Sequence, residues 1–134
     1  MKRHSARWMQ FKILSNLFYI LPLYYAAVAQ LWLSVLLMFL IVFFGTLHHL
    51  SNERRYFWSD AASAVSLICS NLWLCYGGQF KTPYFPIAFL FLVLALFYYF
   101  YFQRQNMVQY NLNHGLWHLY GALITLFCIF TFTL

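Results

Sequence analysis

The fold is decided by one long apolar stretch, ILSNLFYILPLYYAAVAQLWLSVLLMFLIVFFGTLHHL, which runs from Ile13 to Leu50 without a charged residue. A single straight helix of this length would measure roughly 57 Å, about twice the thickness of the hydrocarbon core of a bilayer. We therefore expect two membrane-spanning helices with a turn near Gln30. The alternative is a break at Pro22, which would leave a short half-helix on its N-terminal side.

The rest of the chain has the same apolar character. Of its 134 residues, 64% are hydrophobic, 24% are aromatic and only 7% are charged, and the mean hydropathy is +0.68. A soluble domain carries about 25% charged residues to cover its surface. This composition excludes a water-soluble globule, a disordered chain and a coiled coil. Because the apolar stretches are also too numerous for a secretory signal, we expect an integral, multi-pass membrane protein.

Five segments come close to the roughly 20 apolar residues that a spanning helix requires. They cover residues 13–29, 31–50, 61–76, 84–102 and 115–134, and the third is the shortest. The sequence thus predicts an all-α, polytopic transmembrane bundle of about five spans. We find no internal repeat and no linker, so residues 1–134 are expected to form a single transmembrane domain.

The distribution of cations predicts the orientation. With five spans, the N-terminus and the loops after the second and fourth spans lie on one side of the membrane. That side receives seven of the eight cations, namely Lys2, Arg3, Arg7, Lys12, Arg54, Arg55 and Arg104, and the other side receives Lys81. The positive-inside rule makes the first side cytoplasmic, so the N-terminus is expected inside. We expect no nucleic-acid binding, because the basic residues are divided among three short segments.

The cysteines give no sign of a disulfide framework. Cys69, Cys75 and Cys128 are odd in number, lie inside apolar runs and lack a CxxC spacing. We interpret them as small buried hydrophobic residues that carry no information about the redox compartment.

Histidines gather at two predicted helix ends on the cytoplasmic side. His48 and His49 close the second span, and His114 and His118 open the fifth. Residues four apart share a helix face, so His114 and His118 suit two ligands of one metal ion. Three protein ligands with one open position are typical of catalytic zinc. His48 and His49 point about 100° apart, so one of them is the expected third ligand and the other is interfacial.

Asp60 opens the third span on the same side of the membrane. Ionisable residues at membrane depth are costly and therefore candidates for function. Asp60 could orient or deprotonate a water that the metal polarises. It could equally be an N-terminal carboxylate favoured by the helix dipole, or an ion-pair partner of Arg54 or Arg55. The sequence leaves these interpretations open.

Small polar residues continue from Asp60 along the third span at spacings of three or four. They are Ser63, Ser66, Ser70 and Asn71. We expect this stripe to face the bundle, mainly because small hydroxyl residues let transmembrane helices pack closely. Asn16 on the first span and Thr125 on the fifth are interpreted in the same way.

The run Gly45-Thr46-Leu47-His48-His49-Leu50-Ser51-Asn52, then Asp60, then His114-Gly115-Leu116-Trp117-His118, resembles the CREST superfamily of membrane proteins. That superfamily includes alkaline ceramidases, the progestin and adiponectin receptors, and a branch with myomaker and a GPI-trimming phospholipase A2, which these motifs resemble most. The resemblance implies a Zn²⁺ ion held by His49, His114 and His118. It also implies that Asp60 assists the hydrolysis of an amide or ester bond in a membrane lipid.

Two features depart from the family pattern. The family has a serine one helical turn before the first ligand histidine, where this chain has Gly45, and Thr46 is the candidate for the missing hydroxyl. The family fold has seven spans rather than five.

From the histidine motifs and the resemblance together, we expect a zinc-dependent intramembrane hydrolase that acts on a lipid, with the acyl chain of the lipid lying between helices. The alternative is a non-enzymatic protein with a structural zinc, active in membrane remodelling or receptor-like. A haem protein is less expected, because no second histidine pair frames a macrocycle.

Overall fold

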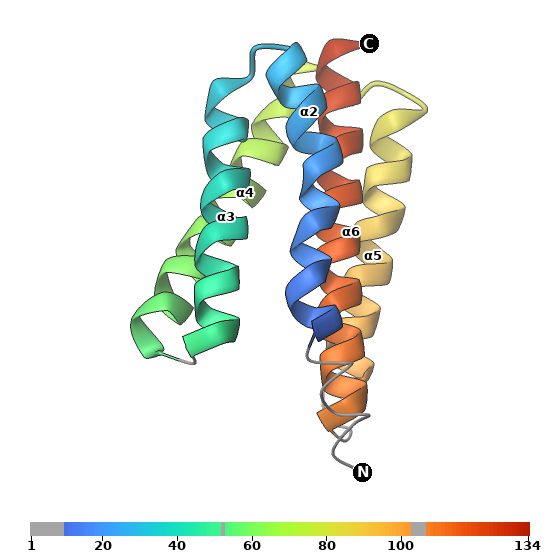
Figure 1. The fold of residues 1–134 in the computed structure, drawn as a ribbon. Coiled ribbons are helices and arrows are strands. Elements are labelled where there is room, and N and C mark those ends of the chain that lie inside the picture. Colours follow the sequence, from blue (N-terminus) through green and yellow to red (C-terminus); the bar gives the residue numbers. More distant parts are fainter. Residues whose placement is uncertain (1–9, 52, 103–106) are drawn as a thin grey trace.

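The computed structural model describes residues 10–51, 53–102 and 107–134, and these residues form helices joined by short turns (Figure 1). The elements are η1 (Ser15–Tyr19), α2 (Ile20–Val28), α3 (Trp32–Ser51), α4 (Arg54–Gly77), α5 (Tyr84–Phe102) and α6 (Met107–Thr133). No strand occurs within the described residues. The all-α helical bundle expected from the sequence is confirmed.

The first helical run, Gln10–Val28, contains η1 and α2 and ends at the expected turn. Gln30 reverses the chain in the left-handed conformation, with a φ angle of 58°. The alternative break at Pro22 is wrong, because Pro22 lies inside α2. Its ring still affects the helix, since a proline lacks the N–H group and crowds the carbonyl four residues earlier. The tighter 3₁₀ turns of η1 end at Tyr19, three residues before the proline.

Helix α6 lies at the centre of the bundle. It packs against η1, α2, α4 and α5, whereas α3 packs against η1, α2 and α4. Among the residues that the structure describes, α3 and α6 do not pack along their lengths. Figure 1 shows α3 and α4 as a hairpin whose lower part stands apart from α2 and α6. The end of α3 and the beginning of α6 therefore approach each other mainly through long side chains.

Two helices begin earlier than the sequence predicts. Helix α4 begins at Arg54 rather than near residue 61, and α6 begins at Met107 rather than near residue 115. Hydropathy marks where apolar residues begin, and a helix can continue through polar residues beyond that point. Asp60 therefore lies in the second turn of α4, and His114 and His118 lie well inside α6.

Within the part of the chain that the structure describes, three helical segments are long and apolar enough to cross a membrane. They are Gln10–Val28, Trp32–Ser51 and Asn111–Thr133. In α5 the apolar stretch Tyr84–Phe100 is shorter, and the polar residues of α4 lower the hydropathy of that helix. Large apolar side chains on the outside of the bundle are exposed, including Leu33, Leu72 and Leu90. These features indicate a protein embedded in a membrane.

The polar stripe of α4 joins that helix to two neighbours. Ser63, Ser70 and Asn71 are buried, as expected. The hydroxyl of Ser70 lies 3.2 Å from that of Ser34 on α3, and the amide nitrogen of Asn71 donates to Thr125 Oγ1 of α6 at 2.9 Å. These contacts agree with the interpretation of the stripe as a helix-packing surface.

Ser66 and Cys69 do not follow this pattern. Both side chains are exposed, so the expectation that they are buried in the bundle is wrong. The hydroxyl of Ser66 donates instead to the carbonyl of Ala62, one turn earlier in its own helix, at 2.9 Å. A serine can satisfy its hydroxyl in this way on any face of a helix, so spacing alone does not identify the packed side.

We expect Gly78→Ala to lower stability strongly. A Cβ atom on Gly78 would lie less than 2.5 Å from the backbone carbonyl oxygen of Thr131, which cannot move without shifting α6. Overpacking of this kind costs roughly 1 to 3 kcal/mol. Thermal unfolding in detergent measures the effect. Gly45→Ala is the matched control, because its Cβ would meet the end of a side chain, Asp60 Oδ1, at 3.2 Å. Equal unfolding midpoints for the two variants would contradict the expected packing.

Candidate metal centre

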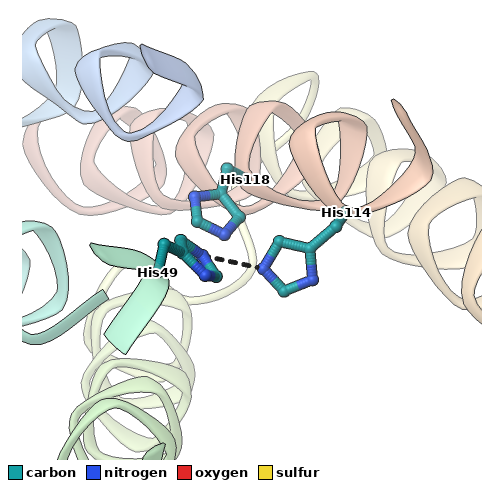
Figure 2. Close-up of side chains that lie close together, drawn as sticks. All are labelled: His49, His114 and His118. Carbon is teal, nitrogen blue, oxygen red and sulfur yellow. Dashed lines mark hydrogen bonds between the residues drawn. The ribbon is translucent and has the colours of Figure 1, made fainter. Parts of the chain in front are cut away.

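Three histidines converge between α3 and α6 (Figure 2). His49 comes from the last turns of α3, and His114 and His118 come from α6. The Nε2 atoms of His49 and His114 are 3.1 Å apart. One nitrogen from each of the three rings lies within 4.8 Å of the others. The structure therefore brings together the three residues that the sequence singled out.

Helix geometry explains the convergence. His114 and His118 are one turn apart on one face of α6, and their ring centroids are 4.8 Å apart. Helix α3 ends and α6 begins at the same end of the bundle, which brings His49 opposite that face. His48 points elsewhere, and its ring contacts Phe57 of α4 at a centroid distance of 5.4 Å. His49, not His48, is thus the member of the pair that joins the cluster.

The cluster fits a metal ion. Two nitrogen ligands about 2.05 Å from a tetrahedral ion lie about 3.3 Å apart, close to the 3.1 Å between His49 and His114. The Nδ1 atoms of His48, His49 and His118 are all buried and lack a hydrogen-bond partner within the described part of the chain, so this property does not distinguish the clustered histidines from His48. Neutral imidazoles suit zinc, copper, nickel or iron. The three histidines could therefore hold a metal ion.

Asp60 lies beside Gly45 of α3, one helical turn before His49. One oxygen of its half-buried carboxylate is 3.2 Å from the point that a Cβ atom on Gly45 would occupy. Gly45 precedes His49 by four residues, which is about 6 Å along the axis of α3, so the carboxylate lies at a level about one helical turn before that histidine. The alternative of an ion pair between Asp60 and Arg54 or Arg55 is wrong, because among the described residues Arg55 pairs with Glu53 at 2.6 Å and neither arginine pairs with Asp60. Asp60 also lies beyond the first turn of α4, to which the influence of the helix dipole is confined.

Asn16 completes the polar surroundings. Its amide nitrogen donates to Thr46 Oγ1 at 3.1 Å, and its Oδ1 atom lies 3.5 Å from the same point above Gly45. Asn16 is 1% exposed, and this oxygen has no hydrogen-bond partner among the described residues. Asn16 and Asp60 thus border one small space above Gly45. The sequence pattern predicts only a packing role for Asn16, although a lone amide within an apolar run is also a signal of function.

An apolar groove of about 570 Å³ lies between the first helical run and α6. Its wall includes Leu17, which follows Asn16 in sequence, and Leu119, which follows His118. The wall continues along α6 to Leu126, about 10 Å further along the helix axis. The groove therefore begins at the depth of the polar residues and runs away from them.

Together these features define a membrane-embedded helical bundle with a three-histidine site that could hold a metal ion. Comparisons with models of protein families, with curated proteins and with solved structures find no match. The function of the chain is therefore inferred from its own residues.

Proposed function

We propose that this protein is a zinc-dependent intramembrane hydrolase that cleaves an amide or ester bond of a membrane lipid, in the manner of a ceramidase or phospholipase. The single observation that carries the proposal is the cluster of His49, His114 and His118, with the Asp60 carboxylate about one turn away. The resemblance of these motifs to the CREST superfamily supports the same activity.

Zinc is the proposed ion because the three candidate ligands are imidazoles and leave one coordination position open. Three neutral ligands leave the charge of the ion uncompensated, and the nearby Asp60 carboxylate offsets part of it. When bound, zinc supplies Lewis acidity, which polarises a carbonyl group and makes water acidic enough to attack at neutral pH.

The residues around the ion have separate tasks in this proposal. Asp60 accepts the proton of the attacking water and returns it to the leaving group, as a general base and then a general acid. Thr46, held by the amide of Asn16, offers a hydroxyl near the reacting carbonyl.

The apolar groove suits the acyl chain of the substrate. Its lining side chains are apolar apart from the phenol of Tyr24, and it begins at the depth of Asn16 and His118, the residues that precede Leu17 and Leu119 in the chain. An acyl chain lying in the groove would bring its head end to the depth of the histidines.

A structural role for the metal is the second candidate function. It is favoured by the lack of extended packing between α3 and α6 in the described residues, across which the imidazoles reach. An ion at that position would tie the two helices together. Structural zinc sites usually have four protein ligands, however, and this group has three. The hydrolase is therefore our leading proposal.

We also propose that the chain crosses the membrane about five times with its N-terminus in the cytoplasm. The uneven distribution of Lys and Arg supports this orientation. A protease-protection assay with tags at the two termini tests it, and tags on the same side would contradict it.

The enzymatic proposal is tested with the purified full-length protein in lipid vesicles. We expect release of fatty acid from ceramides, phospholipids or lysolipids, loss of this release with a chelator, and recovery on addition of Zn²⁺. The variant Gly45→Ser is assayed in parallel, because it restores the serine of the family pattern and its Cβ would meet only side-chain ends, Asp60 Oδ1 at 3.2 Å and the Asn16 amide at 3.5 Å. Wild type and Gly45→Ser that both retain full zinc and release no fatty acid would favour the structural candidate.

A further inference from the structure

A pair of sulfur atoms lies inside the bundle near the ends of two helices. Cys75 is three residues before the end cap of α4, and Cys128 is in the last third of α6. Both side chains are only 3% exposed, and their Sγ atoms are 3.3 Å apart. A disulfide bond has an S–S length of about 2.05 Å, so the atoms need to approach by about 1.2 Å to be joined. The two residues are 53 positions apart in sequence, which is why no local motif indicates the pair.

Contacts on either side fix the register of the two helices around this pair. One turn earlier, Asn71 on α4 donates to Thr125 on α6 at 2.9 Å. Just after it, Gly78 packs directly against the backbone of Thr131. The two helices run in the same direction through these contacts, so the sulfur atoms meet between two tight points of the interface. Their proximity therefore reflects helix packing rather than the movement of a loop.

The pair lies at the end of the bundle opposite the histidine cluster. His49, His114 and His118 are at the end where α3 stops and α6 begins, whereas Cys75 and Cys128 are near the far ends of α4 and α6. With the N-terminus in the cytoplasm, the cysteine end is on the outer side of the membrane. Compartments on that side are oxidising and permit disulfides.

We propose that Cys75 and Cys128 form a disulfide bond that joins α4 to α6 in the mature protein. The two thiols lose two protons and two electrons as the S–S bond forms. The oxidant is the disulfide of a thiol–disulfide oxidoreductase on the outer side, which is reduced to a dithiol by two exchange steps. The exchange takes place as the helices assemble, before packing buries both sulfur atoms. This bond is independent of the proposed hydrolase activity.

Cys69 provides an internal reference for the test. It lies on the same helix as Cys75 but is exposed on the outside of the bundle. It has no cysteine neighbour among the described residues, so its thiol stays free and reacts under all conditions. Labelling of the three cysteines therefore distinguishes a disulfide from general oxidation.

The experiment counts free thiols in the full-length protein taken from cell membranes. Cells are quenched with acid, the protein is denatured in detergent, and a polyethylene-glycol maleimide is added with or without prior reduction. We expect one label per chain without reductant, on Cys69, and three after reduction. Three labels without reductant would overturn the proposal.

Two variants assign the bond. Cys69→Ser is expected to take no label without reductant and two after it, and Cys75→Ser is expected to take two under both conditions. The count is made on denatured chains, so it does not require a variant to fold. Two labels on unreduced Cys69→Ser would contradict the bond even if the wild-type count were lowered by other oxidation.

Discussion

The variant His118→Ala is expected to lose its metal ion completely. His118 is the most buried of the three histidines, at 7% exposed, and its removal leaves only two imidazoles within reach of an ion. Two nitrogen ligands rarely retain zinc, and the apparent binding free energy of such sites depends on the full ligand set. Elemental analysis of protein purified without chelator should give about one zinc per chain in wild type and almost none in the variant.

His48→Ala is the matched control for this prediction, because His48 is adjacent in sequence and lies outside the cluster. It should keep its zinc. Added Zn²⁺ should also raise the unfolding midpoint of wild type and His48→Ala but not that of His118→Ala. A ligand at 100 times its Kd stabilises the folded state by about 2.7 kcal/mol. A zinc content that falls in His48→Ala and stays high in His49→Ala would show that we chose the wrong member of the pair.

We expect Asp60→Asn to reduce lipid hydrolysis by about 10²-fold to 10⁴-fold, the range for loss of a positioned acid–base group. The amide has nearly the same shape as the carboxylate and fits the same space beside Gly45, but it cannot accept the proton of an attacking water. Asp60 is not a member of the ligand cluster, so zinc content should stay near that of wild type. Rates and zinc content are measured on the same preparations.

Two comparisons separate catalysis from a structural role for Asp60. Ser66→Ala changes an exposed residue on the same helix and should leave rate, zinc content and unfolding midpoint unchanged. A purely structural Asp60 predicts a different result for Asp60→Asn, namely a parallel loss of stability and zinc. That result would favour a structural role for the metal over hydrolysis.

The sequence was sufficient to predict the histidine cluster because helix geometry and membrane crossing leave few alternatives. A spacing of four fixes His114 and His118 on one face of a helix. Two spans separate the two motifs, and an even number of crossings returns the chain to the end of the bundle where His49 lies. Spacing alone does not decide between His48 and His49, because the two rings point in different directions from the same turn and either could face the bundle. The family resemblance indicates His49.

Other features depend on contacts between distant segments and could not be predicted from the sequence. The pairing of Cys75 with Cys128 follows from the register of α4 against α6, and nothing local to either residue indicates it. The position of Asn16 above Gly45 likewise depends on how the first helical run packs against α3. The first residues of α4 and α6 could not be predicted for another reason. Both helices begin in polar residues, which hydropathy assigns to loops.

Helix α6 is central in the bundle and also the last described helix in the sequence, which determines when the histidine cluster can form during synthesis. The ribosome delivers α6 after every other described helix, and α6 contributes two of the three clustered histidines. A nascent chain that ends before α6 carries only His49 and cannot assemble the cluster. In the proposed hydrolase, the ability to cut lipids would therefore arise only once synthesis has passed His118, which protects the membrane that receives the growing chain.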